Sequence, residues 1–200
     1  MLEVGGIDRP FLEKGAGFDY VGMDIEHRPK CDEVYDRFFV QSIEEPLSGK
    51  YDLIISRMVL EHVPDNEKTW SVMYEALKPG GKAIHIFPSG LHPYSLATRL
   101  VGNKLQRKLI RLYRPNAVEV TGYPAFYNRC SPRALRKTLE RMAYGSIEIR
   151  TNYSAAEYFN FFLPAFLIVA SFNLLCHKLG VQMSCSNVFV SVQKPEVANN

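Results

Sequence analysis

Residues Glu3-Val4-Gly5-Gly6, followed by Tyr20-Val-Gly-Met-Asp-Ile25, are the strongest indication of the fold in this sequence. A short strand that runs into glycines, with an acidic residue about twenty positions later, is typical of nucleotide-binding α/β units. The glycines let the backbone approach a ligand, and the carboxylate of Asp24 would accept hydrogen bonds from ribose hydroxyls. Because adjacent glycines also occur in simple tight turns, the downstream sequence has to discriminate between the two interpretations.

Two downstream stretches favour the nucleotide-binding unit. Residues 51–65 predict a buried strand that breaks into a loop containing Leu60-Glu-His-Val63, and residues 75–82 predict a helix end and a turn, Leu77-Lys-Pro-Gly-Gly81, that feeds another strand. With these motifs the chain resembles the class I S-adenosylmethionine (SAM) dependent methyltransferases, in particular the methyltransferase type 11-like family. The resemblance extends from Met1 to Val192.

Short apolar runs that alternate with helical stretches predict an α/β fold with a Rossmann-like, seven-stranded, mostly parallel sheet and helices on both faces. The predicted strands are 2–5, 20–25, 37–41, 51–56, 82–87, 145–151 and 187–193. The resemblance implies that the last two form an antiparallel pair at the edge of the sheet. The family normally has a helix before its first strand, and this sequence begins almost at that strand, so we expect either a fragment or another cover for that face.

Two helices have clear start signals. Asp65 is the predicted N-cap of a helix over 66–77, which Pro79-Gly80-Gly81 would stop. Ser131-Pro132 predicts a second helix start, with a capping hydroxyl and a proline at the first helical position.

Composition indicates one domain, because 200 residues with 46% hydrophobic content can bury a single ordinary core. We expect a methyltransferase domain over 1–193, insertions at 89–127 and 157–180, and a polar tail over 194–200. The net charge of +3 is too small to indicate a nucleic-acid partner. The four cysteines form no C-x-x-C pair, and the sequence starts with no signal peptide, so we predict reduced thiols and a cytoplasmic protein.

The first insertion contains a leucine-rich, basic stretch over 96–114, and no acidic residue occurs between Glu75 and Glu119. Such a basic amphipathic helix predicts peripheral contact with an anionic membrane or attraction of an acidic substrate. The alternative is a solvated basic face over an ordinary packed stripe.

The second insertion is nearly all apolar over 158–176. A single membrane crossing there would leave the sixth and seventh strands on opposite sides of a bilayer, although these strands are expected to pair. We therefore predict a buried helix or a broken helical pair, with shallow peripheral membrane contact as the alternative.

The resemblance implies SAM as the cofactor and carries over a set of binding residues. Glu3 and the Gly5-Gly6 backbone would face the methionine part, and Asp24 would accept both ribose hydroxyls. The remaining implied contacts are Ile25 beside the adenine, Ser42 and Ile43 at its edge, and Ser56 and Arg57 beneath the sulfonium.

The glycine loop departs from the D/E-x-G-x-G-x-G pattern of the family. Ile7 and Arg9 stand where the later glycines would be, and Pro10 predicts a shortened turn in place of a full helix start. Ser42 stands where an aspartate often contacts the adenine amine, and its hydroxyl is a weaker hydrogen-bond partner.

Methyl transfer from a sulfonium depends mainly on alignment, and a general base helps when the acceptor is a hydroxyl. We name two candidate catalytic histidines, His92 just after the fifth strand and His62, and we expect Tyr94 and Tyr127 to line the acceptor pocket. Glu61-His62 resembles part of an E-x-x-E-H metal cluster of some quinone-biosynthesis methyltransferases. No metal is predicted, because Met58 replaces the first glutamate and a thioether is a poor ligand for a hard cation.

The predicted function is SAM-dependent O-methylation of a small or lipid-linked metabolite, such as a glycan precursor or an amphiphile. The alternative is a catalytically silent methyltransferase-like domain used for binding or scaffolding, which the altered glycine loop would favour. A short-chain dehydrogenase is rejected, although Tyr74 and Lys78 fit its Y-x-x-x-K pattern, because Pro79-Gly80-Gly81 ends the helix immediately afterwards.

Overall fold

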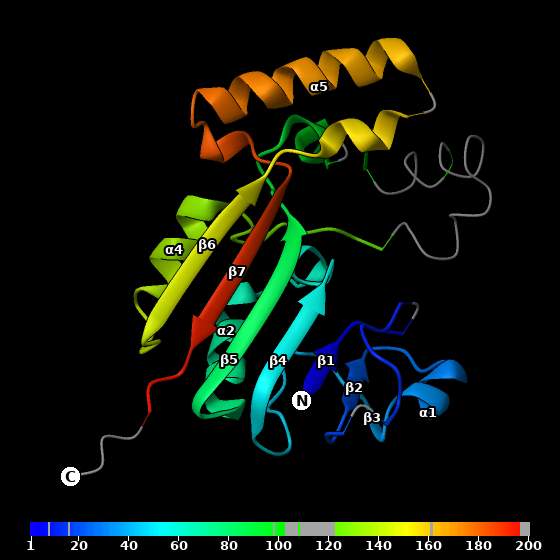
Figure 1. Cartoon of the computed structure of the whole chain (residues 1–200), viewed down its shortest axis with the longest axis vertical. Helices are drawn as coiled ribbons and strands as arrows, with labels where there is room; N and C mark the ends of the chain where they lie inside the picture. The colour runs from blue at the N-terminus through cyan, green and yellow to red at the C-terminus, as the bar shows by residue number, and fades with distance from the viewer. Residues whose placement is uncertain are drawn as a thin grey trace.

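The computed structural model describes residues 1–7, 9–15, 17–97, 99–102, 108, 123–160 and 162–196 (Figure 1). Its centre is one seven-stranded sheet with the strand order β3-β2-β1-β4-β5-β7-β6. The strands are β1 Leu2–Val4, β2 Val21–Asp24, β3 Arg37–Val40, β4 Tyr51–Arg57, β5 Leu77–Pro88, β6 Ser146–Asn152 and β7 Asn187–Gln193. All seven predicted strands are present.

The strand directions place the carboxyl ends of β1 to β5 at the same end of the sheet. Strands β1 to β5 pair in parallel, whereas β7 is antiparallel to both β5 and β6. The predicted antiparallel pair at the edge is confirmed, with β7 as the reversed strand and β6 outermost. Because the strand order reverses between β1 and β4, the ligand crevice of such a sheet lies at the carboxyl ends of these strands.

The junction of α2 (Asn66–Ala76) and β5 differs from the prediction. The Asp65 side chain accepts from the Lys68 nitrogen at 3.1 Å, which confirms the N-cap. However, β5 begins at Leu77, so the predicted stop over 79–81 lies inside the strand. Gly80 has a φ of +76° and donates to the Lys194 carbonyl at 3.1 Å, so this stretch forms an irregularity in a long strand where the prediction had a separate turn.

Helices cover the two faces of the sheet unequally. Leu2 and Val4 of β1 pack in one core cluster with Trp70 of α2, and α4 (Pro132–Leu139) lies on the same face (Figure 1). Glu3 points to the opposite face, because side chains alternate along a strand. There its carboxylate meets Tyr35, the residue after α1 (Lys30–Val34). In the described part of the chain, α1 covers only the β1–β3 region of that face.

The predicted N-cap of α4 is also confirmed. The hydroxyl of Ser131 accepts from the Ala134 nitrogen at 3.4 Å, and Pro132 occupies the first turn. Leu135 and Leu139 are buried against the sheet. The cap therefore fixes the start of a helix whose apolar stripe completes the main core.

The predicted basic helix over 96–114 lies mostly outside the described residues. Residues 93–97 and 99–102 are helical, and of the later part only Lys108 is described. Arg99 is the described basic residue of the helical part. Lys104, Arg107, Arg111 and Arg114 are not described.

The second insertion forms two helices, η3 (Ala155–Phe159) and α5 (Leu163–Lys178), that lie across the carboxyl ends of β5 and β6 (Figure 1). Of the two predicted forms, the broken helical pair is present, and the single buried helix is wrong because only Asn173 and Cys176 of α5 are buried. A helix that is apolar on all sides has no single stripe to bury, and only its underside meets the rest of the domain. No described helix is both long and apolar enough to cross a membrane.

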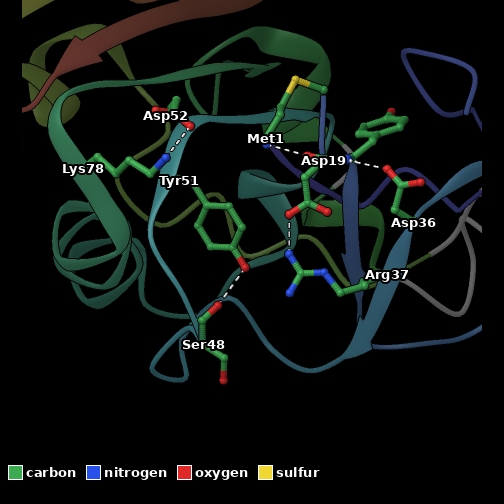
Figure 2. A network of polar contacts seen from close by, with 9 residues as sticks. Met1, Asp19, Asp36, Arg37, Ser48, Tyr51, Asp52 and Lys78 are labelled. Carbon is green, nitrogen blue, oxygen red and sulfur yellow. Dashed lines mark hydrogen bonds and ion pairs between the residues drawn. The ribbon is translucent and has the colours of Figure 1, made fainter. Parts of the chain in front are cut away.

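The amino ends of the strands are joined by polar contacts (Figure 2). Arg37 at the start of β3 forms an ion pair with Asp19, and Lys78 of β5 contacts Asp52 of β4 at 2.8 Å. Tyr51 donates to the Ser48 carbonyl at 2.8 Å. These exposed pairs add little stability individually. They occupy the end of the sheet opposite the predicted site.

Candidate functional site

Glu3 is an internal anchor for the loop that follows β1. Its carboxylate accepts hydrogen bonds from the hydroxyls of Tyr20 and Tyr35, the latter at 3.1 Å. The Phe11 nitrogen lies 3.2 Å from both carboxylate oxygens. Burial raises the pKa of Glu3, and these hydrogen bonds oppose the rise. The carboxylate thus holds Phe11 over the end of β1, and its role toward the methionine part of SAM stays a prediction.

Gly5 and Gly6 are required by close packing against the protein itself. Gly5 has a φ of +80° and donates to the Met23 carbonyl at 2.8 Å, and a Cβ there would lie 2.2 Å from Val59. A Cβ on Gly6 would lie 2.0 Å from the Tyr35 hydroxyl. Side chains larger than hydrogen are therefore excluded at both positions.

Arg57, at the end of β4, holds the same loop from the other side. Its guanidinium donates to the Arg9 carbonyl at 2.9 Å and lies 4.7 Å from the centre of the Phe11 ring. In the described residues between β1 and β2 there is no helix, as Pro10 predicted. In its place residues 9–12, which we call the 9–12 cover, lie over the carboxyl end of β1.

Asp24 ends β2 beside Val40 of β3 in the parallel register. The side chain of Asp24 is half-buried and accepts from the Glu26 nitrogen at 3.2 Å. Ile25 is 64% exposed and Val40 is 61% exposed, so two uncovered apolar side chains flank the carboxylate. An accepting carboxylate beside apolar side chains fits a ligand that carries a diol next to a flat apolar ring, such as an adenosine.

The other predicted adenine and sulfonium residues occupy different environments. The Ser42 hydroxyl accepts from the Glu44 nitrogen at 3.2 Å, and Ile43 is buried in the main core. Ser56 is buried and lies 2.7 Å from Nδ1 of His85. Burial lowers the pKa of His85 to about 3, so this pair is a neutral core contact between β4 and β5.

Residues 123–127 form another side of the site, next to the loop after β1 and the end of β2. The nitrogens of Phe126 and Tyr127 donate to the Glu61 carbonyl at 2.8 and 3.0 Å, which ties this segment to η1 (Leu60–His62). The Tyr123 hydroxyl donates to Glu26 at 3.2 Å, which ties it to the residues after β2. The segment thus bridges the ends of β2 and β4.

The backbone around this bridge is locally strained. Met58 and Tyr127 have φ values of 57° and 50°, in the left-handed region that non-glycine residues rarely adopt. Met58 lies just before η1, and the Tyr127 nitrogen is hydrogen-bonded to the Glu61 carbonyl of η1. Such conformations concentrate at functional sites, so they support this end of the sheet as the site.

His62 has the geometry of a neutral base. Its Nδ1 lies 2.9 Å from the Pro124 carbonyl, which can only accept, so Nδ1 carries the hydrogen and Nε2 keeps a lone pair. Its ring centre is 6.0 Å from that of Tyr123, and 35% of its side chain is exposed. Burial lowers the pKa of His62, which favours the neutral form at pH 7.

Glu61 is a buried acid that sequence reasoning considered only as a metal ligand. Its Oε2 has no hydrogen-bond partner within the described residues, and Oε1 lies 3.8 Å from Nε2 of His62. Burial raises the pKa of Glu61 to about 8, so the carboxyl is mostly protonated at pH 7. Its position inside the Leu60-Glu-His-Val63 loop was the only available signal.

His92 belongs to a separate cluster beneath α5. It is buried, accepts from the Tyr94 nitrogen at 3.1 Å, and its ring centre lies 6.2 Å from that of Phe172. Burial lowers the pKa of His92, and the neighbouring Asn173 amide opposes this change. Nε2 of His92 and both amide atoms of Asn173 form no well-aligned hydrogen bond with other described residues, so the contact is a close approach.

The two predicted pocket tyrosines contact different residues. Tyr94 packs edge-to-face on Phe159 of η3 at 6.3 Å, whereas the guanidinium of Arg99 lies 6.0 Å from the Tyr127 ring centre. The structure therefore brings His62 and Tyr127 together at η1, and places His92 and Tyr94 against η3 and α5.

Comparison with known families identifies the fold. Residues 1–144 match the family model described as "Methyltransferase domain". The chain belongs to this family. The predicted relation to the class I SAM-dependent methyltransferases is thereby confirmed.

The methyltransferase domain is similar to several characterised proteins. It is 50% identical to phosphoethanolamine N-methyltransferase 2 of Caenorhabditis elegans over 36 residues, which are 18% of this chain and 8% of that protein. Phosphoethanolamine N-methyltransferase 2 of Haemonchus contortus, solved with phosphomonomethylethanolamine and S-adenosylhomocysteine, superposes with a TM-score of 0.58 at 18% identity. That match covers 98% of this chain and 48% of the other, so the chain spans about half the length of the solved relative.

A SAM-dependent methyltransferase of Archaeoglobus fulgidus is also similar. It has a TM-score of 0.59 at 16% identity, and the match covers 96% of this chain and 85% of that one. At such identity the likeness concerns the fold, which is that of a methyltransferase over nearly the whole chain.

Proposed function

We propose that this methyltransferase domain binds SAM at the carboxyl ends of β1 to β4 and methylates a hydroxyl of a small or lipid-linked metabolite. The observation that carries the proposal is the half-buried Asp24 carboxylate between the exposed side chains of Ile25 and Val40. A carboxylate accepts two ribose hydroxyls, and a flat base would cover the two apolar side chains. When bound, SAM supplies an electrophilic methyl group on a sulfonium.

Different residues of this chain would bind different parts of the cofactor. Asp24 would bind the ribose, and the Ser42 hydroxyl would lie at the adenine edge. Because Glu3 is already engaged by Tyr20 and Tyr35, the methionine part would meet the backbone of Gly5-Gly6 and the 9–12 cover. The same cover would keep water from the reacting groups.

We assign the role of proton acceptor to His62 in preference to His92. His62 is partly exposed, its Nε2 has a lone pair, and its lowered pKa keeps it neutral at pH 7. His92 is buried beneath α5 beside Asn173. Acceptance of the hydroxyl proton by His62 would increase the nucleophilicity of the acceptor oxygen.

A second candidate is methylation of a phosphorylated amine. It is favoured by the similarity to the phosphoethanolamine N-methyltransferases of Caenorhabditis elegans and Haemonchus contortus. An amine nucleophile requires less help from a base than a hydroxyl does. His62→Gln should therefore lower the rate strongly for a hydroxyl acceptor and weakly for an amine acceptor.

Calorimetric titration of the purified chain with SAM and S-adenosylhomocysteine tests the cofactor site. We expect saturable binding that Asp24→Ala weakens at least about tenfold, because hydrogen bonds to a charged group contribute roughly 1.5–3 kcal/mol each. Glu33→Ala, at an exposed position of α1, is the matched control and should bind as the wild type does.

The result that contradicts the proposal is binding that Asp24→Ala leaves unchanged. Absence of binding by a chain with a cooperative unfolding transition would instead favour the catalytically silent domain. Once binding is established, transfer of a labelled methyl group to hydroxylated acceptors and to phosphoethanolamine distinguishes the two acceptor classes.

We also infer a cytoplasmic location. The four cysteines are buried and unpaired, which suits a reducing compartment. A cysteine-alkylation assay on cells, with and without prior reduction, tests this location, and detection of a disulfide would contradict it.

A further inference from the structure

The outer side of α5 is mostly apolar, and Ser171 is its exposed polar residue before His177 and Lys178 at the end of the helix. Six large side chains are each more than half exposed: Phe162, Leu163, Leu167, Ile168, Leu174 and Leu175. Exposed apolar residues occur singly on most proteins, but contiguous patches mark sites of interaction. We call this set the α5 surface.

The orientation of α5 is set by its underside. Asn173 and Cys176, one turn apart, are its buried residues, and the ring centre of the neighbouring Phe172 lies 6.2 Å from that of His92 in the body of the domain. At 100° per residue, Leu167 and Leu175 lie on the opposite side of the helix axis, and Ile168, also on that side, is 71% exposed. The α5 surface therefore faces away from the domain.

The length of α5 determines how it could meet a bilayer. Its 16 residues span about 24 Å, which is shorter than the roughly 30 Å hydrocarbon core of a membrane. An apolar helix of this size suits a position parallel to the membrane plane, at the depth of the headgroups.

The charges around the α5 surface favour a lipid partner over a second copy of the chain. Helix α5 contains no acidic residue and ends with His177 and Lys178. The helical residues 93–97 and 99–102, which pack on Phe159 of η3 through Tyr94, expose Arg99 and Leu100. No acidic residue occurs from 76 to 118. Anionic headgroups would pair with these basic residues, whereas the α5 helix of a second copy would offer them no acidic partner.

We propose that the α5 surface and the adjoining residues 99–102 form a membrane-docking surface that lies in the headgroup region of an anionic bilayer. Because α5 crosses the carboxyl ends of β5 and β6, docking would turn the methyl-transfer end of the sheet toward the lipid (Figure 1). An amphiphilic acceptor would then reach the site from the membrane. This last step rests on the proposed function, and the docking itself does not.

Flotation with vesicles tests the docking. The wild-type chain is mixed with vesicles of phosphatidylcholine alone or of phosphatidylcholine with phosphatidylglycerol, at low and high salt. We expect flotation with the anionic vesicles that weakens at high salt, and a loss of at least about tenfold in the Ile168→Glu/Leu175→Glu variant. Both positions are exposed, so folding should be preserved.

The matched control is Phe18→Glu, an exposed aromatic residue in the loop before β2, which should float as the wild type does. A wild-type chain that stays in the soluble fraction with both vesicles overturns the proposal, as does flotation that the double variant leaves intact. Sedimentation velocity distinguishes a lipid partner from a second copy of the chain. If the wild type forms a dimer, the double variant abolishes it and no vesicle binding is found, the surface is a dimer interface and the proposal is overturned.

Titration with SAM separates the two proposals. The Ile168→Glu/Leu175→Glu variant should bind SAM with the affinity of the wild type. Flotation without SAM binding would refute the proposed function and leave the docking standing, whereas SAM binding without flotation would do the reverse.

Discussion

Glu61 gives a prediction that can be worked through from the structure. Its carboxyl is buried inside η1, and its Oε2 has no hydrogen-bond partner in the described part of the chain. Burial raises the pKa of Glu61 from 4.5 to about 8 in the folded protein. The unfolded chain returns the carboxyl to water and to its ordinary pKa. Unfolding therefore releases a proton at intermediate pH.

The sign and size of the effect follow from linkage. Between about pH 4.5 and about pH 8 the folded state binds one proton more than the unfolded state, so the free energy of unfolding falls as pH rises. The stabilisation is fully present below pH 4.5 and is lost as pH rises through the folded value of about 8. Each pH unit in this range lowers the free energy of unfolding by about 1.4 kcal/mol, so a rise of two pH units near neutrality lowers it by roughly 3 kcal/mol.

Urea unfolding of the wild type and Glu61→Gln at about pH 5.5 and about pH 7.5 measures this difference. Glutamine is similar in shape and never ionises, so the variant should lose roughly 3 kcal/mol less stability than the wild type over that range. Glu33→Gln, at an exposed position of α1, is the control and should follow the wild type. Parallel pH profiles for the wild type and Glu61→Gln would refute the reasoning.

Two further predictions concern the glycine loop and α2. Gly6→Ala should lower the free energy of unfolding in urea by about 1–3 kcal/mol, because the new methyl group would lie 2.0 Å from the Tyr35 hydroxyl. Combination with Tyr35→Phe should cost less than the sum of the two changes, and simple additivity would contradict the contact. Asp65→Ala should cost about 1 kcal/mol by removing the N-cap of α2. Asp65→Asn, which keeps an accepting oxygen, should retain most of that stability, and equal losses would exclude the cap as the cause.

Much of the fold could be predicted because its signals are local. Apolar runs of strand length marked all seven strands, and Asp65 and Ser131 marked two helix starts through contacts with residues three positions later. The early start of β5 was missed, since Pro79 and Gly80 ordinarily end regular structure. The pairing of Tyr51 with Leu77 across the sheet overrides that preference.

The candidate site could be predicted only in part. The position of Asp24 at a strand end follows from the short apolar run that it closes. The contacts of Glu3 with Tyr20 and Tyr35 join residues 17 and 32 positions apart, so they depend on how the loop and α1 pack. The bridge from Tyr123 to Glu26 spans 97 positions and is equally invisible in the sequence.

By itself the sequence determined the α/β fold class and the seven strands along the chain, because strand periodicity is encoded locally. The tertiary structure alone decided which side chains fill the space beside the glycines and where α5 lies. An apolar helix without a polar stripe carries no information about which of its sides is covered. Only the packing of Asn173 and Cys176 on the domain turns the other side of α5 outward, and with it the surface that we propose meets a membrane.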